Sequence, residues 1–174
     1  MDKTLNNFES ELTKEDLKDV LFECSMSTEL TAKFFFPERF TLPFSDMHHQ
    51  VFKLLDDDKI QLLAIAANRG FGKTSIVQLA YLCKRALFKD SRFIIPISNT
   101  ATQAVLQSDN LKKEVISNTM LRKVFGEQKT EIWSQERWVM QCGAMIMPRG
   151  SGQQVRGLLY GDDRPDLILL DDFE

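Results

Sequence analysis

The chain has 174 residues, enough for one ordinary domain with its own hydrophobic core. Hydrophobic residues make up 43% and charged residues 27%, a composition that excludes a disordered chain. The sequence contains no run of 18 apolar residues and begins with polar residues, so neither a membrane span nor a secretory signal is expected. The net charge of −3 excludes a generally basic nucleic-acid coat. The charge is nevertheless segregated, with −6 over residues 1–60, +8 over 61–161 and −5 over 162–174.

Cysteine spacing predicts no disulfide framework and no zinc site. The chain has three cysteines, Cys24, Cys83 and Cys142, with 59 residues from each to the next. An odd number at this wide spacing matches neither a disulfide framework nor a zinc site. We expect three reduced cysteines that pack as small hydrophobic side chains.

The first part of the chain predicts helices. Apolar residues at helical spacing indicate helices over 10–23 and 28–36, with Thr28 as a cap for the second. A third helix is expected over 44–55, with Ser45 or Asp46 as its N-cap, and the acidic run 56–58 is interpreted as its solvated end. Residues 1–40 are therefore taken as an N-terminal helical segment.

Alternating strands and helices are expected from residue 62 onward. The continuous apolar run 62–66 is typical of a strand buried on both faces, and a glycine-containing loop and a helix over 73–88 follow it. A second strand over 92–98 precedes a second helix over 100–117. This order predicts a β-α-β crossover and an α/β fold with a mainly parallel central sheet.

The remaining chain predicts a hairpin and a last buried strand. Residues 136–142 and 144–148 alternate apolar and polar positions on either side of Gly143, as in an exposed antiparallel pair inserted into the fold. Residues 148–157 are interpreted as a polar loop. The apolar strand 166–170 then leads directly into Asp171.

Residues 67–74 read ANRGFGKT, close to the phosphate-binding pattern of glycine, four residues and Gly-Lys-Ser/Thr. In that pattern backbone N–H groups surround the phosphates, the lysine reaches the β- and γ-phosphates, and the hydroxyl binds Mg²⁺. Ala67 replaces the first glycine, but the expected strand before the loop and helix after it restore the context. The residues expected to bind ATP are Ala67, Asn68, Arg69, Gly70, Phe71, Gly72, Lys73, Thr74 and Ser75.

The carboxylates after the last strand supply the expected second half of this site. An apolar strand ending in a carboxylate that holds Mg²⁺, followed by a carboxylate that polarises water, is typical of nucleotide triphosphatases. We assign the metal to Thr74 and Asp171. The catalytic base is Asp172 or Glu174, and the sequence leaves this choice open.

These motifs together resemble the ATPase domain of the large terminase subunit of tailed bacteriophages. The resemblance covers roughly residues 40–174 and implies a three-layer P-loop NTPase of the RecA/ASCE type. It rests on four stretches of sequence, AIAANRGFGKTSIVQLA, PFSDMHHQVFKLL, FIIPISNTATQAVLQSDNLKKEV and GQQVRGLLYGDDRPDLILLDDFE.

The resemblance also implies roles for residues outside the loop. Arg69 would sense the γ-phosphate, and the 43–50 segment would lie beside adenine with His48 or Gln50 nearest the base, unless it is only an amphipathic helix start. Arg156, with Arg149 as second choice, would reach into a neighbouring subunit, unless it is a surface or DNA-facing arginine. The polar residues after the second strand would face the ligand, unless they only cap the helix: Ser98, Asn99, Thr100 and Gln103.

The family's biology sets the expected partners. They are double-stranded DNA, a portal protein, a small terminase subunit and copies of the chain in a ring, in the host bacterial cytoplasm and without a membrane. The family's nuclease domain is not matched, so 41–174 is expected to be an incomplete ATPase domain: a fragment, one piece of a split protein whose other piece carries the nuclease, or the product of an interrupted gene. The alternatives are a helicase of the DExD type and a fragment that binds nucleotide or a partner without turnover.

Overall fold

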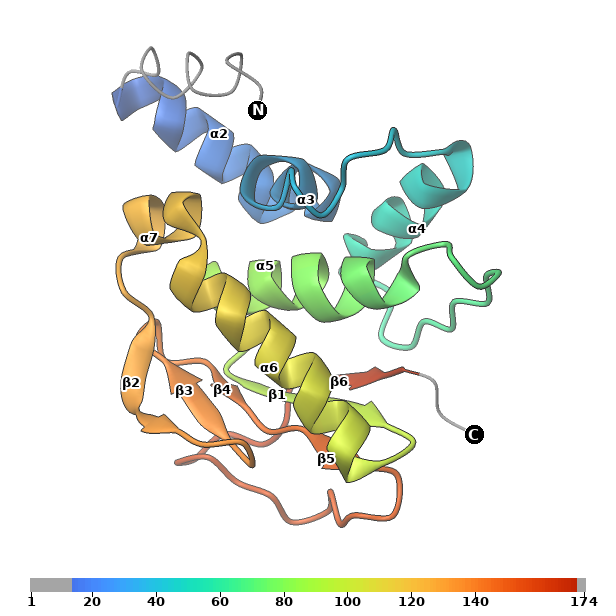
Figure 1. Ribbon diagram of the computed structural model, residues 1–174, viewed down its shortest axis with the longest axis vertical. Helices are drawn as coiled ribbons and strands as arrows, with labels where there is room; N and C mark the ends of the chain where they lie inside the picture. Colours follow the sequence, from blue (N-terminus) through green and yellow to red (C-terminus); the bar gives the residue numbers. More distant parts are fainter. Residues whose placement is uncertain (1–13, 172–174) are drawn as a thin grey trace.

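The computed structural model describes residues 14–171 and shows helices stacked over one face of an open six-stranded sheet (Figure 1). The helices are α2 (Lys14–Met26), α3 (Thr28–Phe35), α4 (Asp46–Leu55), the π-helix η1 (Ser75–Tyr81), α5 (Leu82–Leu87), α6 (Ala101–Ser117) and α7 (Thr119–Phe125). The strands are β1 (Phe93–Ser98), β2 (Lys129–Trp133), β3 (Trp138–Met140), β4 (Met145–Ile146), β5 (Arg149–Gly150) and β6 (Leu167–Leu170). None of the described helices has the length and apolar character needed to cross a bilayer.

The sheet is mixed, so the expectation of a mainly parallel sheet is wrong. β1 lies between β6 on one side and β4 and β5 on the other, and it pairs with all three in parallel. β3 pairs antiparallel with both β4 and β2. The pattern of residues 129–133 did not predict the strand β2. The sheet is therefore parallel only around β1, because β4, β5 and β6 reach it by crossover connections.

The expected hairpin around Gly143 is present, but it belongs to the central sheet and is buried. Trp138 pairs with Ile146 and Val139 with Met145, while β4 continues the sheet onto β1. All residues of β3 and β4 are buried. The indole N–H of Trp138 is satisfied by Ser108 of α6 at 2.8 Å. The alternation did not reveal this burial, because α6 and the 155–160 loop cover both faces of the pair.

Two cores lie on opposite faces of the sheet, and only one of them contains helices. Leu169 and Ile94 face the core made with α3, η1, α5 and α6. On the other face, Phe93, Ile95 and their neighbours pack against Val155, Leu158 and Tyr160 of the loop before β6. Within residues 14–171 the fold is thus helices on a sheet with a loop beneath it, and a three-layer arrangement with helices on both faces is not seen.

The expected strand over 62–66 is not formed. Leu62 is 92% exposed, and the segment pairs with no strand of the described chain. A groove of about 610 Å³ separates it from β6, and Leu62, Leu63 and Ile65 line the groove opposite residues 166–171. β6 is buried on one face only, since Ile168 is 48% exposed. An apolar run becomes a buried strand only where a neighbouring strand supplies hydrogen bonds. Here the groove lies between residues 62–65 and β6, and the two segments do not pair.

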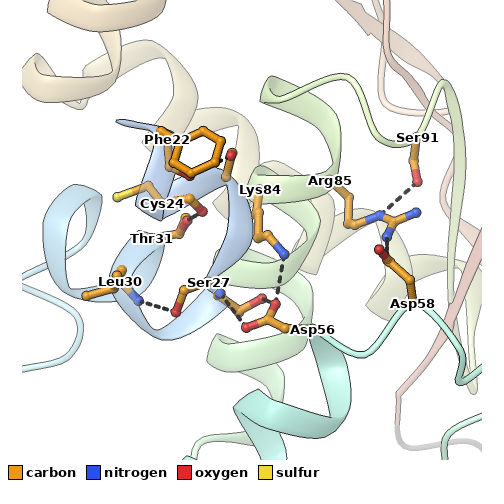
Figure 2. A network of polar contacts seen from close by, with 12 residues as sticks. Phe22, Cys24, Ser27, Leu30, Thr31, Asp56, Asp58, Lys84, Arg85 and Ser91 are labelled. Atoms are coloured by element: carbon orange, nitrogen blue, oxygen red, sulfur yellow. Dashed lines mark hydrogen bonds and ion pairs between the residues drawn. The ribbon is translucent and has the colours of Figure 1, made fainter. Parts of the chain in front are cut away.

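The helical layer is held together by the carboxylate of Asp56, so the interpretation of the acidic run 56–58 as a solvated helix end is wrong for this residue. Asp56, the residue after α4, accepts hydrogen bonds from the backbone N–H and the hydroxyl of Thr28 and from the ammonium of Lys84 (Figure 2). Ser27, not Thr28, is the N-cap of α3. One side chain therefore joins the end of α4, the start of α3 and the middle of α5.

The cysteines agree with the expectation for reduced, packed thiols. All three are free, and Cys24 and Cys83 are buried. Burial raises the pKa of Cys24 to about 11, and burial also raises the pKa of Cys83 and of Cys142. Thiols with raised pKa are poor nucleophiles and poor metal ligands, which leaves these residues a packing role.

The close approach of β5 to the start of α6 depends on Gly150. A Cβ at this position would lie 2.5 Å from the backbone nitrogen of Ala101, and backbone cannot move aside cheaply. We expect Gly150→Ala to lower the free energy of unfolding by about 1–3 kcal/mol, measured by urea denaturation. Gly152→Ala, where a Cβ meets nothing within 4 Å, is the matched control. Equal stability of the two variants would contradict the described packing.

Candidate functional site

The 67–74 loop joins a segment without regular secondary structure to a long helix. Gly70 and Gly72 have φ of +87° and +84°, backbone conformations that side chains with a Cβ rarely adopt. A turn closes from Phe71 N–H to the Asn68 carbonyl at 3.2 Å. The Lys73 ammonium donates to the Ala67 carbonyl at 2.7 Å, so the lysine lies across the loop that precedes it. The loop thus places a cation and a helix N-terminus at one point.

The helix after the loop contains an unexpected π-helical segment. The chain turns helical at Lys73, and η1 occupies Ser75–Tyr81 before α5 continues the helix. Within η1 the side-chain amide nitrogen of Gln78 is buried and has no hydrogen-bond partner among the described residues. The 3.6-residue spacing of apolar positions predicted the helix but contains no signal for the wider turn.

Thr74 and Asp171 are in direct contact although 97 residues separate them in sequence. The Thr74 hydroxyl donates to Asp171 Oδ2 at 2.8 Å. Asp171 is 8% exposed, and its backbone N–H bonds to Ile97 at the end of β1. The structure therefore brings together the two residues assigned to the metal from sequence.

Gln107 of α6 completes this cluster and was not among the residues singled out from sequence. Its Nε2 donates to Asp171 Oδ2 at 3.2 Å, and its Oε1 accepts from the Ser98 hydroxyl at 2.7 Å. Of the other polar residues expected beside the ligand, Thr100 caps α6 by accepting from the Gln103 N–H. The available signal for Gln107 was weak, because a glutamine on an amphipathic helix is usually solvent-exposed.

The donor set at Thr74 and Asp171 fits Mg²⁺, which prefers oxygen ligands and keeps several waters or phosphate oxygens. Because the Thr74 hydroxyl donates its proton to Asp171, its lone pairs remain free to bind a cation. Asp171 Oδ2 accepts both protein hydrogen bonds, which leaves Oδ1 for the cation or its water shell. Within 14–171 no group of three or more His, Cys, Asp or Glu is arranged to hold a metal ion.

His48 contacts the loop, whereas Gln50 does not. The His48 ring stacks on Phe71 with centroids 4.1 Å apart and planes 4° apart, and its Nε2 lies 2.9 Å from the Phe71 carbonyl. Its Nδ1 accepts from the Ser45 N–H, which fixes the tautomer with the proton on Nε2. Gln50 instead lines a separate cavity of about 770 Å³ together with Glu29 of α3 and other residues of α4.

The candidate arginines lie outside this cluster. Arg69 and Arg156 are exposed, and neither side chain makes a hydrogen bond or ion pair within the described chain. The Arg149 guanidinium contacts Pro148 and Met147 instead of the loop. Asp172 and Glu174 lie outside the described residues. Within residues 14–171 the structure thus brings Thr74 and Asp171 into contact, but it does not bring the candidate arginines to them.

Comparison with known proteins adds no assignment. The chain matches no family model, no curated protein and no solved structure.

Proposed function

We propose that this chain binds ATP with Mg²⁺ and hydrolyses it as the ATPase part of a viral DNA-packaging motor. The observation that carries the proposal is the 2.8 Å contact between the Thr74 hydroxyl and Asp171. Thr74 belongs to the 67–74 loop and Asp171 follows an apolar strand, and the sequence assigned both residues to one metal. Neither motif by itself implies that two residues 97 positions apart are in contact.

Each part of the cluster has a separate task in this proposal. The amides of the 67–74 loop and the N-terminus of the following helix bind the phosphates, and Lys73 exchanges its bond to Ala67 for bonds to the β- and γ-phosphates. Mg²⁺, when bound, neutralises phosphate charge. Asp171 and Thr74 hold it. Asp172 or Glu174 orients the attacking water, and Arg69 faces the γ-phosphate.

The motor role rests on the resemblance to the large terminase subunit. In this role the chain forms a ring on a portal protein, a small terminase subunit delivers double-stranded DNA, and Arg156 contacts a neighbouring subunit or the DNA. The exposure of Arg69 and Arg156 is compatible with contacts made only after assembly. A helicase of the DExD type would use the same cluster on a different nucleic acid, so stimulation of hydrolysis by double-stranded DNA rather than single strands favours the packaging motor.

The metal part of the proposal is tested by titrating a fluorescent ATP analogue with and without Mg²⁺. We expect Mg²⁺ to tighten binding to the wild-type chain and Asp171→Ala to lose at least about tenfold of that gain, equivalent to about 1.4 kcal/mol. Asp162→Ala, a substitution of an exposed acid before β6, is the control and should keep the gain. An undiminished Mg²⁺ effect in Asp171→Ala would contradict the assignment.

A further inference from the structure

Gln107 lies at the centre of a chain of hydrogen bonds that joins three elements of the fold. Ser98 ends β1, Gln107 is on α6, and Asp171 follows β6 directly. The contacts run from the Ser98 hydroxyl to Gln107 Oε1 and from Gln107 Nε2 to Asp171 Oδ2, at 2.7 Å and 3.2 Å. Thr74 then donates to the same carboxylate oxygen.

The chemistry of the partners fixes the orientation of the Gln107 amide. An ionised carboxylate accepts hydrogen bonds only, so the group that faces Asp171 must be the NH₂. The carbonyl oxygen is then left to accept from Ser98, whose side chain is fully buried. Neither end of the amide can rotate without breaking one of these bonds, and the amide therefore holds Asp171 in one rotamer.

We propose that Gln107 is a positioning residue for the metal carboxylate. By holding Oδ2 together with Thr74, it turns Oδ1 of Asp171 toward the place where a divalent cation is bound with the nucleotide. The role rests on the proposed Mg²⁺-ATP function and adds a residue, and a helix, on which metal affinity depends. Hydrogen-bond partners that orient a ligating carboxylate typically change metal affinity by about 10- to 100-fold when removed.

The test compares nucleotide affinity with and without Mg²⁺ in three single variants. Gln107→Leu removes both hydrogen bonds at similar volume. Gln107→Glu keeps the acceptor for Ser98 but places an oxygen, instead of a donor, against Asp171. Asn110→Leu, at an exposed position of the same helix, is the control. Thermal unfolding of each variant, followed by circular dichroism, accompanies the titrations and identifies any variant that fails to fold.

We expect Gln107→Leu and Gln107→Glu to weaken the Mg²⁺-dependent part of binding by about 10- to 100-fold. The affinity of Gln107→Leu without Mg²⁺ should stay within the range of Asn110→Leu. An intact Mg²⁺ effect in Gln107→Leu would overturn the inference, and so would stronger Mg²⁺ binding in Gln107→Glu, because it would make position 107 a site for a direct ligand. If the wild-type chain itself shows no Mg²⁺ effect, the proposed function fails instead. If Gln107→Leu does not fold, the folded Gln107→Glu decides the result.

Discussion

Replacing Lys73 by alanine is expected to weaken ATP binding by about 10- to 100-fold. A hydrogen bond to a charged group contributes about 1.5–3 kcal/mol, which corresponds to this range of affinity. In the structure the Lys73 ammonium donates to the Ala67 carbonyl at the start of the 67–74 loop, so the charge lies beside the loop whose amides would surround phosphates. Titration of a fluorescent ATP analogue measures the loss.

Lys113→Ala provides the matched control for this substitution. Lys113 is exposed on α6 and its ammonium makes no hydrogen bond or ion pair within residues 14–171, so its removal changes net charge by the same unit without touching the loop. Equal ATP affinity in Lys73→Ala and Lys113→Ala would contradict the assignment of the loop to phosphate binding. The two titrations are run at one ionic strength, because screening changes any effect of net charge alone.

The sequence predicted the parts of the site that local pattern encodes. The spacing of Gly70, Gly72, Lys73 and Thr74 identified the loop, and the apolar run before Asp171 identified β6. The contact of Thr74 with Asp171 agrees with the assignment of both residues to one metal, whereas the pairing of β6 with β1 that permits this contact was not predicted. The loop and β6 could be found because each depends on a few adjacent residues.

The predictions that failed depend on partners distant in sequence. Residues 62–66 have the composition of a buried strand, but no strand pairs with them in the described chain. The 136–148 hairpin has the alternation of an exposed pair, yet α6 and the 155–160 loop bury it. Gln107 and Asp56 are ordinary polar residues in sequence. Gln107 acquires its role from residues at the ends of β1 and β6, and Asp56 acquires its role from residues of α3 and α5.

Removing the carboxylate of Asp56 is expected to cause the largest loss of stability. In Asp56→Ala the ammonium of Lys84, 6% exposed, loses its partner, and the N–H of Thr28 at the start of α3 loses its acceptor (Figure 2). Breaking a buried ion pair by removing one partner costs about 3–5 kcal/mol because a charge remains buried without compensation. Urea denaturation should show a loss in this range.

The neighbouring Asp58 supplies the control, since it is the same residue type two positions away. Asp58 is 91% exposed and lies 3.7 Å from Arg85, so Asp58→Ala should change stability by less than about 1 kcal/mol. The double variant Asp56→Ala with Lys84→Met removes the uncompensated charge and should recover part of the loss. Recovery would attribute the cost to the buried ammonium. No recovery, with Asp56→Ala still destabilised, would attribute it to the hydrogen bonds lost by Thr28 at the start of α3. A stability of Asp56→Ala equal to that of Asp58→Ala would contradict the network itself.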